Sequence, residues 1–237
     1  MIKTDGSELN EIFCEGGTSL AYVLGPFDIS KKTLELRSYK IITLEEMAEL
    51  RIKSGAKGPA SLLNSSVKEG TVYVSGRGLF LTKSSPIMDS PEKAVRGGDD
   101  FKWATKEQIE SALGNSIKIQ NQSKGQDYGT GIPFERLGEN QITNFMFGKH
   151  AQNYGDFLKE NVKDKYIRKR GFLLPYVNTS AQYQLTGKGL FGLELVKPDC
   201  LIGQIEFLGI NHPLTGIHSH AHLTSRFVMG IKNLDSK

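Results

Sequence analysis

The sequence predicts an α+β fold built around a largely antiparallel sheet. β-prone runs and amphipathic helical runs are interleaved along the 237 residues. Glycine accounts for 26 residues, about 11% against a usual level of roughly 7%, and proline is not raised, which indicates many tight turns. A hydrophobic share of 38% and a charged share of 24% allow a packed core and exclude a globally disordered chain.

Two strands are predicted near the N-terminus. The first covers residues 18–24, which are rich in β-prone side chains and are followed by Gly-Pro. The second covers residues 33–42, where apolar and polar positions alternate at Leu34, Leu36 and Ile41.

A helix is predicted to begin immediately after this second strand. Thr43 and Glu46 form a capping-box pattern, in which the threonine hydroxyl accepts from a first-turn amide and the glutamate reaches back. Gly55 is the predicted end of this helix. Its apolar face is formed by Leu44, Met47 and Leu50.

The middle of the chain is rich in glycine, serine and lysine. Short strands are expected at residues 71–74 and 79–82, and a short helix at residues 106–113. We expect a single domain, 1–237, with an insertion or flexible region at residues 84–139.

The second half begins with the longest predicted helix, residues 141–161. Gly148 and Gly155 each weaken this helix by about 1 kcal/mol relative to alanine, or permit close packing or a bend. The segments after it are β-prone. They are residues 171–177, 190–196, 201–208, 217–223 and 227–231.

Basic side chains are concentrated in residues 159–170, which hold six basic and two acidic residues and so carry the whole net charge of +4. Such a patch on a neutral body is typical of proteins that bind a polyanion, because phosphate neutralisation releases condensed counterions. A solvated helix end whose cations complement the helix dipole is the alternative interpretation. The predicted phosphate contacts are Lys163, Lys165, Arg168, Lys169 and Arg170, with Tyr166 available for stacking.

Histidines form a second cluster, with four of the five lying within residues 212–222. In a strand at residues 217–223, the period of two would place His218, His220 and His222 on one face. Imidazoles arranged in this way bind transition metals, most simply Zn²⁺, with Glu206 as a candidate carboxylate ligand. The run also resembles the metal-binding His-apolar-His strand of rolling-circle nucleases. A structural polar strand face and a nucleic-acid contact without metal are the alternatives.

Three short segments, residues 55–58, 75–78 and 186–189, each place a lysine or arginine among glycines. Such loops cradle phosphate through backbone amides, although each is also typical of a hairpin turn. None matches the Walker pattern, so ATP use is not expected. Secondary phosphate contacts are predicted at Arg77, Lys188 and Arg226.

Residues 190–208 run through a strand, a Pro-containing turn and a strand with an early glycine. This pattern resembles the RAMP superfamily of CRISPR-associated proteins. The family's early Gly-Ser-Leu helix start is approximated at residues 58–63, and its C-terminal glycine-rich loop would fall at residues 225–230. The resemblance implies a ferredoxin-like, RNA-recognition-type antiparallel sheet with helices and a Gly/Ser-rich insertion, in a subunit that lies along guide RNA.

Charge and resemblance together predict a non-enzymatic, guide-RNA- or nucleic-acid-binding subunit of a cytoplasmic ribonucleoprotein in antiviral defence, with other protein subunits as partners and no cofactor. The first alternative is a metal-dependent phosphodiesterase or nuclease that uses His218, His220 and His222 with Zn²⁺ or another divalent metal. The second is a structural or phage assembly protein whose basic segment contacts another protein. With no run of about 18 apolar residues, no membrane span is expected.

Overall fold

The computed structural model describes residues 8–14, 18–25, 27–62, 65–74, 78–83, 106–120, 131–163, 165–174, 188–195, 217–220 and 226–233. The strands are β1 (Leu9–Cys14), β2 (Thr18–Gly25), β3 (Lys40–Ile41), β4 (Ser65–Val74), β5 (Gly78–Thr82), β6 (Ser116–Gln120), β7 (Gly131–Ile132), β8 (Phe172–Leu173), β9 (Lys188–Leu195), β10 (Ile217–His220) and β11 (Arg226–Asn233). The α-helices are α1 (Phe27–Leu36), α2 (Leu44–Ser54), α3 (Pro59–Leu62), α6 (Lys106–Gly114), α7 (Gln141–Phe147), α8 (Ala151–Asn161) and α9 (Lys165–Arg170). Two 3-10 helices are η2 (Phe134–Glu139) and η3 (Gly148–His150).

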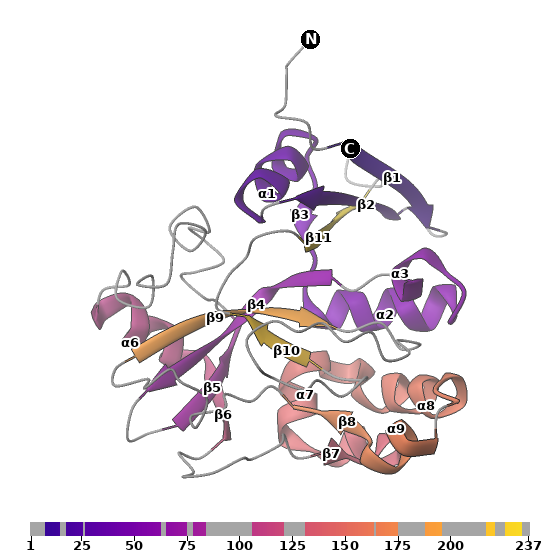
Figure 1. Ribbon diagram of the computed structural model, residues 1–237, viewed down its shortest axis with the longest axis vertical. Coiled ribbons are helices and arrows are strands. Elements are labelled where there is room, and N and C mark those ends of the chain that lie inside the picture. The colour runs from indigo at the N-terminus through magenta and orange to yellow at the C-terminus, as the bar shows by residue number, and fades with distance from the viewer. Residues whose placement is uncertain are drawn as a thin grey trace.

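Most of these strands belong to a nine-stranded sheet, and β7 and β8 form a separate two-stranded ribbon (Figure 1). The main order is β1-β2-β11-β4-β5-β6, with β3 beside β11, β9 beside β4, and β10 beside β9. Among the described strands, only β11 and β4 pair in parallel. The predicted α+β class with a largely antiparallel sheet is confirmed, whereas the ferredoxin-like arrangement is not.

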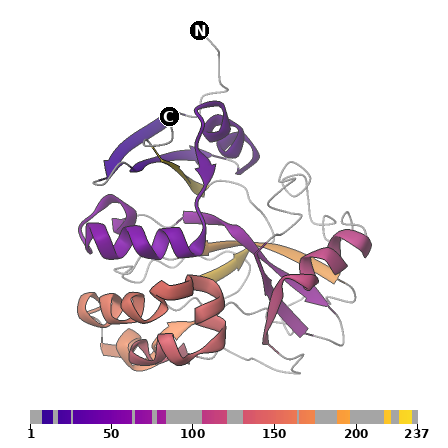
Figure 2. The same cartoon turned by 180° about the vertical axis from the view of Figure 1, so that it is seen from behind.

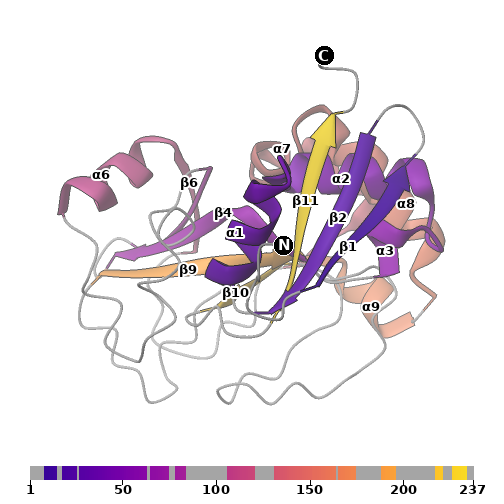
Figure 3. The same ribbon diagram turned by 90° about the horizontal axis from the view of Figure 1, so that it is seen from above.

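Strand β4 joins two parts of the sheet that are turned relative to each other (Figure 3). Ser66 faces Glu194 and Gly70 faces Gly192, so β4 holds two more residues than β9 over this stretch. Such a bulge bends a strand and re-aims its side chains. The bulged segment bonds elsewhere, since the Lys68 amide donates to the Ile42 carbonyl at 3.0 Å, and it brings Glu69 to the start of α2.

Helix α2 begins and ends as the sequence predicts. The Thr43 hydroxyl accepts from the Glu46 amide at 3.2 Å, and the Glu46 carboxylate accepts from the Thr43 amide at 3.0 Å. At the other end, Gly55 has a positive φ of 73° and donates its amide to the Arg51 carbonyl, a conformation that glycine adopts without a steric penalty.

The strand predicted at residues 33–42 is wrong, because most of this segment is helical. Helix α1 ends at Leu36, and only Lys40 and Ile41 form a short strand. The alternation of Leu34 and Leu36 is misleading, since Leu34 is fully buried and Leu36 is 55% exposed. A helix turns residues two apart toward different sides, which accounts for this difference.

The long helix predicted at residues 141–161 is interrupted rather than continuous. Helices α7 and α8 are separated by η3, which begins at Gly148 with a φ of +54°. Gly155 serves close packing instead, because a Cβ built there would collide with the carbonyl oxygen of Phe134 in η2. Gly148 therefore allows the interruption of the helix, and Gly155 allows close packing. These are the two roles that the sequence left open.

The β2–β11 part of the sheet has helices on both faces. Leu20, Met229 and Ile231 belong to the main hydrophobic core, which includes α2, α7 and α8. On the other face, α1 packs on β2 and β11, and Leu34 lies against Gly230. Figure 2 shows α2 between this part of the sheet and the layer formed by α7, α8 and α9.

The remaining predicted elements divide into two groups. Strands β2, β4, β5, β9, β10 and β11 and helix α6 contain or overlap the segments predicted for them. Of the segment predicted at 171–177, residues 171–174 are described, and 172–173 form β8. Within the expected insertion, residues 106–120 form α6 and β6, and residues 131–139 form β7 and η2. Residues 84–105, 121–130 and 201–208 lie outside the described residues.

Candidate functional site

The predicted basic segment lies at a corner formed by the end of α8 and by α9. We call this the basic corner. Its exposed cations are Lys159, Lys163, Lys165, Arg168 and Lys169. Arg170 at the end of α9 is partly buried. The basic corner lies at the end of the molecule opposite β1 and α1 (Figures 1 and 2).

Helix α9 is fastened to its neighbours at both sides. The Arg168 guanidinium donates to the Lys159 carbonyl at 2.8 Å, near the end of α8, where helix carbonyls lack intrahelical partners. After α9, Gly171 has a φ of +74°, and a Cβ there would collide with the Ile132 carbonyl in β7. The hydrogen bond therefore ties α9 to the end of α8, and the glycine allows the chain after α9 to pass close to β7.

The cations of the basic corner are not neutralised by carboxylates of the described chain. The described ion pairs of lysine and arginine join other residues: Lys31 with Glu35, Lys40 with Glu46, Lys53 with Glu49, Lys83 with Glu69, and Arg136 with Glu139. Within the described part of the chain, the five exposed cations of the corner have no such partner. Glu160 and Asp156 are the exposed acidic residues nearest to them along α8.

The other predicted phosphate contacts lie elsewhere. Lys188 begins β9 opposite Val74, and Arg226 begins β11 opposite Gly25. They belong to two strands of the large sheet, whereas α9 belongs to the helical layer. Arg77 lies outside the described residues. Tyr166 lies on α9, within the basic corner.

The histidine cluster is described only in part. His218 and His220 lie on β10, with Glu194 and Gly192 of β9 as their cross-strand partners. His222 and Glu206 lie outside the described residues. Among the residues that the structure does describe, no group of three His, Cys, Asp or Glu residues is arranged to hold a metal ion.

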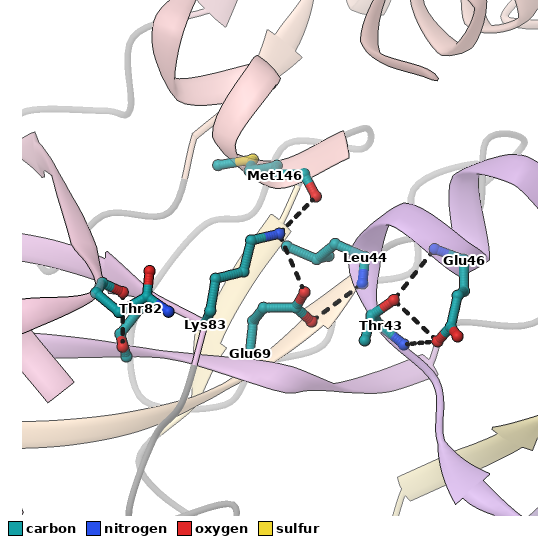
Figure 4. A network of polar contacts seen from close by, with 8 residues as sticks. Thr43, Leu44, Glu46, Glu69, Thr82, Lys83 and Met146 are labelled. Carbon is teal, nitrogen blue, oxygen red and sulfur yellow. Dashed lines mark hydrogen bonds and ion pairs between the residues drawn. The ribbon is translucent and has the colours of Figure 1, made fainter. Parts of the chain in front are cut away.

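A buried polar centre, which the sequence did not reveal, lies where β4, β5, α2 and α7 meet (Figure 4). The Glu69 carboxylate accepts from the Leu44 amide at 3.0 Å and lies 3.6 Å from the Lys83 ammonium. Lys83 also donates to the Met146 carbonyl at 3.3 Å. Glu69 of β4 and Lys83, which directly follows β5, thus connect their strands to α2 and α7.

Burial dominates the electrostatics of Glu69, which is 1% exposed. Desolvation raises the pKa of this carboxyl, and the positive charge of Lys83 and the Leu44 amide oppose that shift without cancelling it. Glu46 at the same helix end behaves differently. Burial opposes ionisation there too, but bonds from Lys40 and Thr43 hold its pKa below the usual value.

A second buried charge, Arg51, lies on the core face of α2. It is fully buried, donates from Nε to the Ala60 carbonyl at 2.9 Å, and donates from Nη1 to the Tyr154 hydroxyl at 2.9 Å. This arginine connects α2 with α3 and α8. A sequence signal existed, because Arg51 follows Leu44, Met47 and Ala48 at the spacing of one helix face.

Comparison with known proteins adds information about the fold. No protein-family model matches the chain, and no curated protein is similar to it in sequence. A solved structure matches with a TM-score of 0.57 and 10% sequence identity, covering 97% of this chain and 99% of the other. It is described as "Accommodation of massive sequence variation in Nanoarchaeota by the C-type lectin fold". The likeness defines the present chain as a protein with a C-type lectin-like fold.

This fold contradicts the expectation of an RNA-binding, CRISPR-type ribonucleoprotein of antiviral defence. The matching structure has a C-type lectin fold, not the RNA-recognition-type fold that the RAMP resemblance implied. In addition, no described helix is long and apolar enough to span a membrane.

Proposed function

We propose that this chain is a non-catalytic recognition module. In it, a C-type lectin-like core supports a binding surface whose residues can be substituted without loss of the fold. One observation carries the proposal: the buried charged groups are used to join structural layers. Arg51 connects α2 to α3 and α8, and Glu69 connects β4 to α2 and, through Lys83, to α7. The exposed residues of those layers take no part in these contacts.

The comparison supports the same interpretation. The solved structure with this fold is described as accommodating massive sequence variation. A scaffold has this property when its stability resides in buried contacts, because surface substitutions away from such contacts usually change stability by about 0.5 kcal/mol or less. Fold alone does not define function, so the proposal requires a test of binding as well as of stability.

The test is a displayed library at exposed positions of the helical layer. Glu135, Gln141, Asn153 and Asp156 are exposed positions on η2, α7 and α8, and they are randomised together. Most members should fold, with midpoints of unfolding within about 4–8 °C of the parent. Selection against a purified protein should then recover folded binders.

The matched control is a library at four buried positions of the same elements, Leu137, Met146, Ala151 and Leu158. This library should lose the fold in most members, because altered core volume costs several kcal/mol. If the surface library unfolds as often as the buried one, or if its folded members yield no binder, the proposal is wrong.

A further inference from the structure

We infer that the basic corner is a docking surface for an acidic protein segment. This inference is independent of the changeable surface proposed above, because it concerns a different set of residues and a fixed charge. The surface consists of Lys159, Lys163, Lys165, Arg168 and Lys169.

The first argument is charge. Isolated exposed cations also occur elsewhere, such as Lys32, Lys57 and Lys118 on separate elements. In the basic corner, five exposed cations lie within eleven residues, and within the described chain none of them is ion-paired. Concentrated charge of one sign steers an oppositely charged partner toward the surface and selects against other partners.

The second argument is preorganisation. The Arg168 bond to the Lys159 carbonyl ties α9 to the end of α8, and the chain after α9 passes close to β7 at Gly171, so the cations have defined positions before any partner binds. A surface held in its binding geometry loses less conformational freedom on association than a flexible tail with the same charge. The structure therefore favours a docking role over a merely solvated helix end.

The third argument concerns the class of partner. Lysine and arginine both neutralise phosphates, but specific recognition of nucleic acid adds forked arginine contacts and stacking aromatic rings. Four of the five exposed cations are lysines, and the Arg168 guanidinium already donates within the fold. Lysine is a point charge on a flexible stem and lacks the rigid fork of arginine. Together with a fold that is not of the RNA-recognition type, this composition favours an acidic protein segment.

The test compares two triple variants of the full chain with equal changes in charge. The first, Lys163→Glu/Lys165→Glu/Lys169→Glu, reverses the basic corner but keeps Arg168, which anchors α9. The matched control, Lys32→Glu/Lys57→Glu/Lys118→Glu, reverses exposed lysines on separate elements. A third variant, with glutamine at positions 163, 165 and 169, removes the charge with a residue that also favours helix. Circular dichroism establishes that each variant is folded.

Two fluorescent probes are used: a peptide of about eight glutamates, and a single-stranded oligonucleotide of about the same charge. Anisotropy is measured at about 10 mM and about 150 mM salt, where the screening lengths are about 30 and 8 Å. The peptide should bind the parent more tightly at low salt. Its affinity should fall about tenfold or more in both corner variants, and less than about threefold in the control.

Three results would overturn the inference. One is the absence of peptide binding by the parent. Another is an equal loss in the corner and control variants, which would show that net charge alone is responsible. The third is tighter binding of the oligonucleotide than of the peptide with the same dependence on the corner lysines, which would assign the surface to nucleic acid.

Discussion

Replacing Tyr154 with phenylalanine should lower the free energy of unfolding by about 1.5–3 kcal/mol, because the change removes the hydroxyl that accepts from a buried arginine. Arg51 is fully buried in the folded chain, so water cannot replace the lost hydroxyl there. In the unfolded chain, water solvates its Nη1 in both the parent and the variant. The packing of the ring should persist. Its centroid lies 4.9 Å from that of Phe147 and 6.0 Å from that of Phe157, and phenylalanine retains both contacts.

The assay is urea unfolding followed by far-UV circular dichroism, together with thermal unfolding. For a chain of this size, a loss of about 2 kcal/mol lowers the midpoint by about 4–8 °C. A double-mutant cycle with Arg51→Met should give a coupling energy of about 1–3 kcal/mol, since the two side chains are in direct contact.

Ser19→Ala provides the comparison. Ser19 is 1% exposed, and its hydroxyl shares a hydrogen bond of 2.7 Å with the Tyr39 hydroxyl, a pairing of two neutral groups. Its loss should cost about 1 kcal/mol, less than the charge-assisted pair. If Tyr154→Phe changes the unfolding free energy by less than about 0.5 kcal/mol, or if the cycle shows no coupling, the assignment of Arg51 as a clamp between α2 and α8 is refuted.

Three further predictions concern the same core. Glu69→Gln should flatten the pH dependence of stability: the native pKa of Glu69 is raised above its ordinary 4.5, so its contribution is fully present below that value and is lost as pH rises through the native pKa. Urea unfolding from acidic to neutral pH measures this, and an unchanged slope contradicts the assignment. Gly155→Ala should destabilise the chain by about 1–3 kcal/mol in thermal unfolding, because its Cβ meets the Phe134 carbonyl, whereas Gly114→Ala, with open space around it, should be neutral or stabilising. Thr43→Ala should cost about 0.5–2 kcal/mol in urea unfolding by removing the N-cap of α2, and a loss near zero would show that Glu46 caps the helix alone.

The sequence predicted correctly those elements whose ends depend on single residues, such as a capping side chain or a glycine with positive φ. Thr43 and Gly55 delimit α2 because a capping oxygen and a positive φ are properties of single residues. The segment at residues 33–42 failed for the opposite reason. Two leucines two residues apart are too few to establish a strand period, and the helical conformation is supported by packing of α1 against β2 and β11.

The polar centre could not be predicted in the same way. Glu69 is buried because a bulge in β4 turns it toward α2, and the bulge is defined by pairing with β9, more than a hundred residues later in the chain. Arg51 is an intermediate case. Its position on the apolar face of α2 was visible, but its partner Tyr154 was not.

The candidate binding residues show the same distinction. Five cations of the basic corner stay together because they are consecutive or nearly so, and the ordered α8–α9 corner keeps them at one surface. Lys188 was predicted from a glycine-rich segment and Arg226 as a further secondary contact, and the sheet places them at the starts of two different strands. A cluster of charges in the sequence therefore predicts a charged surface only where the clustered residues belong to the same or adjacent structural elements.

The RAMP resemblance shows why a short strand–turn–strand pattern did not define the fold. Glycine and proline at a turn reflect the φ values that a tight reversal needs, and those requirements are common to unrelated sheets. What distinguishes one sheet from another is which distant strands pair. Strand β9, the described part of that pattern, pairs with β4 and β10, and β11 runs between β2 and β4. These pairings form an arrangement that matches a C-type lectin fold, and no residue within 190–208 could have specified them. The basic charge is a separate property: it gives the sign of a partner, while the class of that partner depends on how the fold presents the charges.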